Sequence, residues 1–155
     1  MRLPTFTFSL AVCVFASSVL AQSQWKAHPS VGEEFTNSAV VIVGKVVSTR
    51  DVPEAGGFIR GTFYTIQVAE VLKGSSAKTV ELYSENSSGR FPMQVGVSYL
   101  LFAYEGVFEG VQGSHLAIDA SGNSGTLKQS KRALAIVRKL RTRPNTALEP
   151  TAAAL

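Results

Sequence analysis

Residues 39–48 read AVVIVGKVVS, a run of valine and isoleucine that contains a single glycine, Gly44. β-Branched side chains lose rotamer freedom in a helix and pack well on a pleated sheet, so this run predicts a strand. Gly44 predicts a bulge or a sharp bend within that strand. A second apolar run, VSYLLFAY at residues 97–104, predicts a central strand that is buried on both faces.

Further strands are predicted around these two runs. Residues 62–72 alternate apolar and polar side chains until Ala69, where the alternation slips and predicts a second bulge. Residues 51–61 and 86–92 contain the proline, glycine and asparagine residues typical of turns and loops. Shorter strands are predicted at residues 79–84, 107–111 and 114–118. Together these segments predict a mainly β domain.

Two helices are predicted at the ends of this domain. Ser30 and Glu33 have the spacing of a capping box, which predicts a short helix that continues to about Asn37. Thr126 predicts the start of a longer C-terminal helix. Side chains of that helix recur at three- to four-residue spacing, which predicts one face built from Leu127, Leu134, Val137 and either Leu140 or Arg141.

Basic residues are concentrated at the C-terminal end of the chain. Residues 22–127 contain seven basic and ten acidic side chains, whereas residues 128–155 contain seven basic and one acidic. The high pI therefore belongs to the last segment, and no nucleic-acid footprint is expected across the domain. Lys131, Arg132, Arg138 and Lys139 mostly fit the solvated face of the helix. Binding of an acidic polymer or a membrane surface through this face is the alternative interpretation.

The N-terminal 21 residues have the pattern of a cleaved secretory signal peptide, with Arg2, an apolar run and small residues before Gln22. The apolar run is interrupted by serine and threonine and is short for a bilayer, so no membrane span is expected after cleavage. Cys13, the single cysteine of the chain, lies in this segment, so the mature domain is expected to lack disulfides. We therefore expect a secreted or periplasmic domain at residues 22–143 and a disordered tail at residues 144–155.

Residue types used in catalysis are present without a recognisable motif. Ser114 and His115 are adjacent on a predicted strand, so their side chains project to opposite faces. The other histidine, His28, shows no metal-ligand spacing to any partner. We predict no enzyme activity, no cofactor and no metal, and the alternative is a small secreted hydrolase that uses His115 with Asp119 or a glutamate. Asn86 begins a glycosylation sequon, which matters only in a eukaryotic secretory host.

Three further motifs carry a family resemblance. They are EVLKG at residues 70–74, FPMQVG at residues 91–96 and Gly-x-x-Tyr-Leu at residues 96–100. With the valine run and the closing helix, they resemble the tissue inhibitor of metalloproteinases, or netrin-like, superfamily over about residues 30–141. The resemblance implies an OB-like barrel of five or six strands. The animal inhibitors chelate protease zinc through an N-terminal cysteine. The corresponding residues 22–28 of this chain contain no cysteine, so the resemblance does not imply zinc chelation here.

The loops at the rim of such a barrel are the predicted binding surface, because OB-folds bind through loops on a rigid scaffold. The predicted binding residues are Phe58 and Arg60 in one loop and Arg90 and Phe91 in another. We expect a secreted or periplasmic, non-catalytic binding module. Its expected partner is a protein or an extracellular ligand, with a protease among the candidates, and nucleic acid is not expected.

Overall fold

The computed structural model describes residues 28–75 and 77–142. The predicted signal peptide at residues 1–21, its cleavage site before Gln22 and the predicted tail at residues 144–155 lie outside the described residues. Within those two described ranges, no helix has the length and apolar character needed to cross a membrane.

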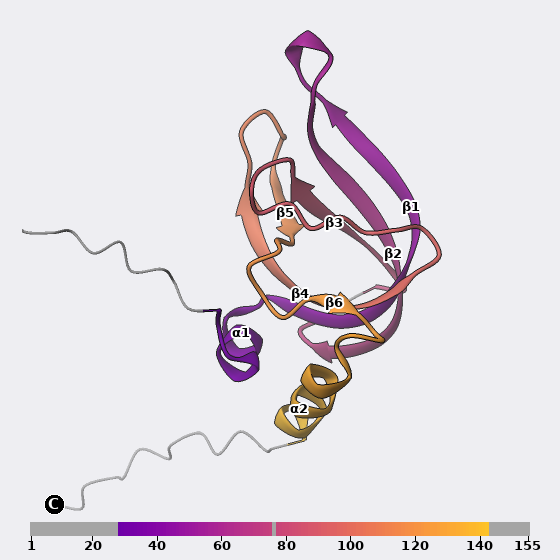
Figure 1. Ribbon diagram of the computed structural model, residues 1–155, viewed down its shortest axis with the longest axis vertical. Helices are drawn as coiled ribbons and strands as arrows, with labels where there is room; N and C mark the ends of the chain where they lie inside the picture. Colours follow the sequence, from indigo (N-terminus) through magenta and orange to yellow (C-terminus); the bar gives the residue numbers. More distant parts are fainter. Residues whose placement is uncertain (1–27, 76, 143–155) are drawn as a thin grey trace, which may run out of the picture.

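The described chain contains six strands and two α-helices (Figure 1). In chain order, the elements are α1 (Val31–Asn37), β1 (Val40–Pro53), a 3₁₀ helix (Ala55–Gly57), β2 (Ile59–Lys73), β3 (Thr79–Glu85), β4 (Ser98–Val107), β5 (Ser114–Ala117), β6 (Gly125–Thr126) and α2 (Lys131–Arg141). The predicted mainly β class, with a short N-terminal helix and a longer C-terminal one, is confirmed.

Five of the strands close into one continuous sheet. Their order is β1-β2-β3-β5-β4, and β4 pairs again with β1. The pairings are antiparallel except that of β3 with β5, which is parallel at Tyr83 and Ala117. The short β6 pairs with the start of β4. Figure 1 places the β1–β2 hairpin at one end of the closed sheet and both helices at the other.

The two predicted bulges are one irregularity in the pairing of β1 with β2. Val43 pairs with Glu70 and Gly44 pairs with Val68, so Ala69 has no partner in this ladder. A Cβ atom at Gly44 would lie 2.9 Å from a carbonyl oxygen of β2, a distance that a side chain does not tolerate. Glycine therefore allows the two strands to approach closely while the bulge bends them around the sheet.

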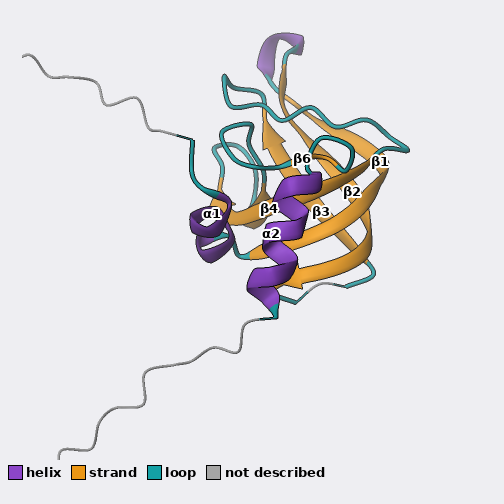
Figure 2. Cartoon of the chain, turned by 60° about the horizontal axis from the view of Figure 1, so that its bottom comes forward, coloured by secondary structure: helices purple, strands orange, loops and turns teal. Residues whose placement is uncertain are grey.

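Alternation along β1 and β4 builds two hydrophobic cores. Ile42 and Leu101 belong to the cluster inside the closed sheet. Val41 and Leu100 belong to a second cluster on the outer face, which α1 and α2 cover (Figure 2). The prediction that residues 97–104 form a strand buried on both faces is therefore confirmed for the central part of β4.

Lys73, at the end of β2, connects the sheet to α1. Its Nζ donates hydrogen bonds of 2.7 to 2.8 Å to the carbonyl oxygens of Phe35, Thr36 and Ser38. Carbonyl groups at the C-terminal end of a helix lack intrahelical donors and favour a positive charge. The next residue, Gly74, turns the chain with a φ of 74°. The Leu-Lys-Gly motif therefore anchors the N-terminal helix to the sheet.

Local signals predicted α1 correctly and α2 only in part. The capping box is confirmed, because the Glu33 amide donates to Ser30 Oγ at 3.2 Å and the Ser30 amide donates to the Glu33 carboxylate at 2.9 Å. The predicted start of the last helix at Thr126 was wrong. Thr126 pairs with β4 as part of β6, and α2 begins at Lys131.

Two predictions at the hairpin end also need correction. Residues 108–113 form a turn between β4 and β5, so the strand predicted at residues 107–111 was wrong. Gly110 and Gly113 take φ values of 68° and 89° there, which strands do not use. The predicted loop at residues 51–61 is shorter than expected, because β1 and β2 both extend into it.

Candidate functional site

The tip of the β1–β2 hairpin presents an exposed aromatic side chain. Phe58 is 70% exposed and its neighbour Ile59 is 39% exposed. The tip is closed by a 2.8 Å hydrogen bond from the Glu54 amide to the Phe58 carbonyl oxygen. Gly56 and Gly57 have φ values of 82° and 80°, which are the conformations that let so short a connection reverse the chain.

Arg60 fixes this hairpin to the turn between β4 and β5. Its guanidinium donates to the Glu54 carboxylate at 3.0 Å and to the Glu109 carbonyl oxygen at 2.9 Å. Gly110 makes room for the guanidinium, since a Cβ atom there would lie 2.8 Å from Arg60 Cζ. Arg60, predicted as a binding residue, is thus already engaged within the domain and positions Phe58.

Arg90 and Phe91 lie in the β3–β4 loop and differ in environment. Arg90 is exposed and donates to Asn86 Oδ1 at 3.3 Å. Phe91 packs against the inner core, with its ring centroid 6.1 Å from that of Tyr99. Its partial burial places Phe91 at the margin of the core.

Asn86 brings the two predicted loops together. Its backbone N–H donates to the Arg60 carbonyl oxygen and its side-chain Nδ2 donates to the Ile59 carbonyl oxygen, both at 2.8 Å. Its Oδ1 accepts from Arg90. The structure therefore joins the base of the β1–β2 hairpin to the β3–β4 loop, the two segments that contain the predicted binding residues. Nδ2, the nitrogen that a glycan would occupy, is one of the atoms that form this junction.

An aromatic cluster that the sequence analysis missed lies beside the hairpin. It consists, in spatial order, of His115, Phe63, Tyr83 and Phe108, whose successive ring centroids are 4.8 to 5.0 Å apart. Arg50 lies over the Phe63 ring at 4.5 Å from the centroid. Phe63 and Tyr83 are direct partners across β2 and β3, a pairing that no signal within either strand predicts. Burial raises the pKa of the Tyr83 hydroxyl, and the charge of Glu85 adds to that increase.

His115 is held by the backbone of its own turn. Its Nε2 lies 2.8 Å from the Gln112 carbonyl oxygen, so Nε2 is assigned as the protonated nitrogen. Asp119, its suggested partner, instead accepts hydrogen bonds from the amide and the hydroxyl of Ser121. Among the described residues, His115 therefore has no hydrogen-bonded carboxylate, and this geometry gives no support to the hydrolase alternative.

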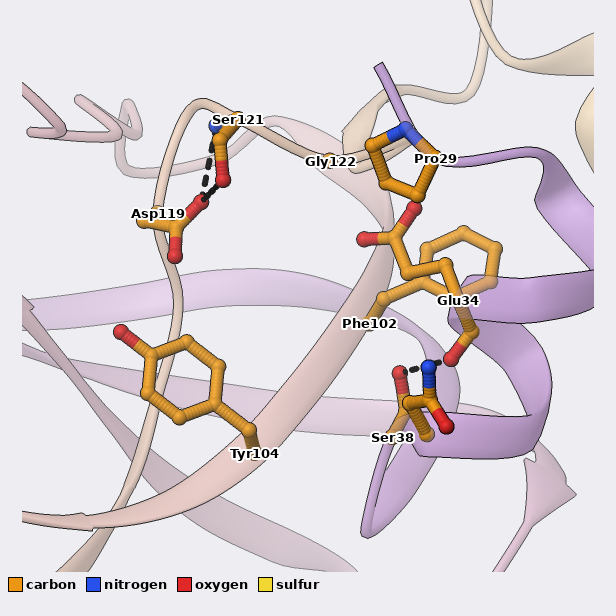
Figure 3. Close-up of a pocket in the computed structure, with 9 residues that line it drawn as sticks. Pro29, Glu34, Ser38, Phe102, Tyr104, Asp119, Ser121 and Gly122 are labelled. Carbon is orange, nitrogen blue, oxygen red and sulfur yellow. Dashed lines mark hydrogen bonds between the residues drawn. The ribbon is translucent and has the colours of Figure 1, made fainter. Parts of the chain in front are cut away.

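A small pocket of about 200 Å³ lies between α1 and the loop that follows β5 (Figure 3). Glu34 enters it from α1 and accepts hydrogen bonds from Asn123 N and Nδ2 at 2.5 and 2.6 Å. Tyr104 and Asp119 line its other side, and burial followed by the Asp119 charge raises the pKa of the Tyr104 hydroxyl. Within residues 28–75 and 77–142, no three potential ligands are grouped closely enough to hold a metal ion. The Glu34 carboxylate therefore holds the loop against α1, whereas the Asp119 carboxylate bonds within the loop.

No protein-family model matches this chain, and a search of curated proteins found no relative. The hairpin tip and the neighbouring turn define one surface, which we call the rim surface and which comprises residues 54–59 and 108–113. It combines an exposed aromatic side chain with a backbone that Arg60 fixes from two sides. This arrangement can bind a complementary surface.

Proposed function

We propose that the chain is an extracytoplasmic, non-catalytic protein-binding module with an OB-type fold, and that the rim surface is where its partner docks. The exposed Phe58 on a fixed hairpin tip is the observation that carries this proposal. Large aromatic side chains are enriched among the residues that dominate binding energy at protein interfaces. A tip that is already ordered loses little conformational entropy on binding.

The strand order supports the OB-type assignment. A five-stranded sheet that closes through β1 and β4, with a parallel contact between β3 and β5, matches a small Greek-key barrel. Proteins with this architecture bind through one face and the loops around it. The N-terminal pattern with Arg2 and the small residues before Gln22 supports export. A protease is one partner class to test, without zinc chelation by an N-terminal cysteine.

Site-specific photocrosslinking tests the proposal. A photoreactive phenylalanine analogue replaces Phe58 in the full chain, which is then mixed with the extracytoplasmic fraction of its own host. The matched control carries the analogue at Val95, which is 58% exposed but lies in the turn before β4. We expect a crosslinked protein from position 58 and none from position 95.

Competition separates specific from incidental crosslinking. Excess unmodified protein should suppress the product at position 58, whereas excess Phe58→Ala protein should suppress it at least about tenfold less effectively, the loss typical of a central interface aromatic. The same products from both positions, no product from position 58, or equal competition by both proteins would contradict the proposal.

A further inference from the structure

The part of β1 that leads to the hairpin tip has a neighbouring strand on one side only. β4 pairs with β1 from Val40 to Lys45, and the last backbone bonds on that side join Val46 to residues 96 and 97. From residue 48 to residue 53, β1 pairs with β2 alone within the described ranges 28–75 and 77–142. Figure 1 shows this arm of β1 at the margin of the hairpin. Its other side is therefore a free sheet edge, which we call the β1 edge and which comprises residues 48–53.

The hydrogen-bond pattern determines which backbone groups face the β1 edge. Backbone groups of successive residues in an antiparallel ladder point alternately to the two sides of a strand. The Arg60 carbonyl oxygen bonds toward β3, where it accepts from the residue that follows that strand. Phe63, three residues later, therefore bonds toward β1, where its partner is Arg50. Thr49 and Asp51, the neighbours of Arg50, consequently direct their N–H and C=O groups to the open side.

These four backbone groups are open to a ligand. Thr49 and Asp51 are both exposed, and no backbone group of the described chain pairs with them from the open side. The Asp51 carboxylate is turned to its neighbour Thr62, whose hydroxyl donates to it at 2.8 Å. An ordered edge of this kind is a template for a further strand. Pro53 lacks an N–H group and ends the edge, so the edge accommodates a short segment.

A pocket lies beside the β1 edge and can receive a side chain. It has a volume of about 270 Å³, and its lining includes Arg50, Val52 and Phe63 of the hairpin and His115 of β5. Side chains of an added strand alternate between the two faces of the sheet, so those on one face meet this pocket.

The pocket carries a cation that is weakly engaged. The Arg50 guanidinium lies over the Phe63 ring, and the Glu81 carboxylate is 3.8 Å from it in a pair whose side chains are 62% and 55% exposed. Exposed pairs of this kind contribute little. No acidic side chain is found among the described residues that line the pocket. A guanidinium that is stacked on a ring and open to solvent favours a carboxylate as its ligand.

We propose that the partner presents an extended polypeptide segment, which adds to the β1 edge as a further strand and places an acidic side chain beside Arg50. This inference rests on the proposed function, because it names the form in which the partner meets the hairpin of the rim surface. Main-chain bonds to Thr49 and Asp51 supply affinity that does not depend on sequence, and the pocket at Arg50 selects the acidic residue. Phe58, further along the same hairpin, contacts the partner beyond the added strand.

Peptide selection tests the inference with a defined probe. A phage-displayed library of random twelve-residue peptides is selected on the immobilised full chain, and the most enriched peptides are synthesised. We expect them to contain an aspartate or a glutamate. In NMR titrations they should shift the Thr49 and Asp51 amide signals and slow hydrogen exchange at both amides. Absence of enriched peptides, or enriched peptides that leave both amides unchanged, would overturn the inference.

Backbone methylation of the strongest peptide separates strand addition from other modes of binding. Each methylated variant lacks one N–H donor of the peptide. In an added strand only alternate N–H groups face β1. The affinity should therefore fall about tenfold at every second position of the paired stretch, the loss expected for one hydrogen bond, and less than about twofold at the positions between. A uniform loss along the peptide, or no loss, would reject strand addition.

Variants of β1 assign the two parts of the site. Thr49→Pro removes an N–H group on the open side and leaves the bonds to β2, and proline is tolerated at such edge positions. It should weaken peptide binding at least about tenfold. Arg50→Gln should weaken an acidic peptide about tenfold, and a peptide with glutamine in place of the acidic residue less than about twofold. The dispersion of the amide spectrum checks that each variant is folded.

Lys45→Gln is the matched charge control for Arg50→Gln. Lys45 is exposed on the same strand but lies where β4 already pairs with β1. Its replacement should change the affinity for the acidic peptide less than about twofold, because exposed charges are well screened. Equal losses in Lys45→Gln and Arg50→Gln would show unspecific attraction and would overturn the role of Arg50.

Two further results would assign the β1 edge to another occupant and overturn the inference. One is a dimer of the free protein, measured by sedimentation, that Thr49→Pro converts to a monomer. The other is slow hydrogen exchange at the Thr49 and Asp51 amides of the free monomer, which would show that the chain itself covers this edge.

Photocrosslinking from position 58 keeps the inference distinguishable from the proposed function. We expect Thr49→Pro to reduce the crosslinked product at least about tenfold. A product that Thr49→Pro leaves unchanged would overturn strand addition and leave docking at the rim surface intact. Peptides that bind the β1 edge in the absence of any product from position 58 would support the edge and contradict docking through Phe58.

Discussion

The helix end and the rim end of the closed sheet are built on different principles. At the helix end, α1 and α2 cover the outer core, and Glu70 of β2 pairs with Arg138 of α2 at 2.6 Å. At the rim end, Arg60 fixes the backbone while Phe58 stays exposed. Burial at one end stabilises the fold, and an ordered apolar side chain stays exposed at the other.

The largest expected effect comes from truncating an apolar side chain at each end. Leu100, with an exposed fraction of 0%, lies in the outer core under the helices. Leu100→Ala should lower the free energy of unfolding by about 3 kcal/mol, since such truncations remove burial and leave a cavity. Phe58→Ala should change it by less than about 0.5 kcal/mol. Urea denaturation of both variants measures the contrast.

Equal destabilisation by the two truncations would contradict this difference between the two ends of the sheet. It would mean that the Phe58 ring is buried in solution and is unavailable to a partner. Unchanged stability in Leu100→Ala would mean instead that the helices do not cover the outer core.

The next effect concerns the polar anchor of the helix end. Lys73→Met keeps a long apolar stem but removes three hydrogen bonds to the end of α1. We expect the free energy of unfolding to fall by about 2 kcal/mol, because hydrogen bonds from a charged donor contribute more than those from a neutral one. The loss is limited because water can bind the carbonyl groups that Lys73 leaves. Lys45→Met is the matched control, since Lys45 is exposed on β1, and it should cost less than about 0.5 kcal/mol. Similar losses in both variants would contradict the anchoring role.

A smaller effect is expected where Arg60 fixes the rim. Arg60→Ala removes the bonds to Glu54 and to the Glu109 carbonyl oxygen, and we expect it to lower global stability by about 1 kcal/mol or less, as is usual for partly exposed pairs. Hydrogen exchange should accelerate at the Glu54 amide, which closes the hairpin tip. Arg90→Ala, which loses one long bond to Asn86, serves as the control. Unchanged exchange at Glu54 in Arg60→Ala would show that the tip is ordered by other contacts.

Sequence patterns predicted the helix end better than the rim. The valine run, the Tyr-Leu strand and the Ser30–Glu33 capping box are local signals, and each predicted its element correctly. The start of α2 was missed because pairing of Thr126 with β4 is a long-range contact that overrides its capping preference. The turn at residues 108–113 was missed because the strand predicted at residues 107–111 included Gly110, which adopts a φ of 68° that strands do not use.

The candidate site was predictable only as a pair of loops. Phe58 lies between residues typical of turns, and its side chain is 70% exposed. The engagement of Arg60 by Glu109 and the partial burial of Phe91 depend on residues distant in sequence.

The smallest effect concerns the pH dependence of the helix end. Two hydrogen bonds lower the pKa of the Glu33 carboxyl below its usual value of 4.5. The first is with the side chain of Ser30 and the second is with the Ser30 backbone amide. A carboxyl group with a lowered pKa in the folded state stabilises the protein fully above its unfolded pKa. That contribution is lost as the pH falls through the lower folded pKa.

Glu33→Gln should therefore be slightly less stable than the original protein at pH 7. The difference should shrink as the pH falls below 4.5, because the original protein then loses the same interaction. Glu105→Gln is the control, since Glu105 is an exposed glutamate on β4 at the rim end. Urea denaturation across this range measures both. The contrary result is a difference in the free energy of unfolding between Glu33→Gln and the original protein that is the same at every pH. That result would show that the Glu33 carboxylate does not hold the start of α1. The stability of the helix end would then depend on burial and on Lys73.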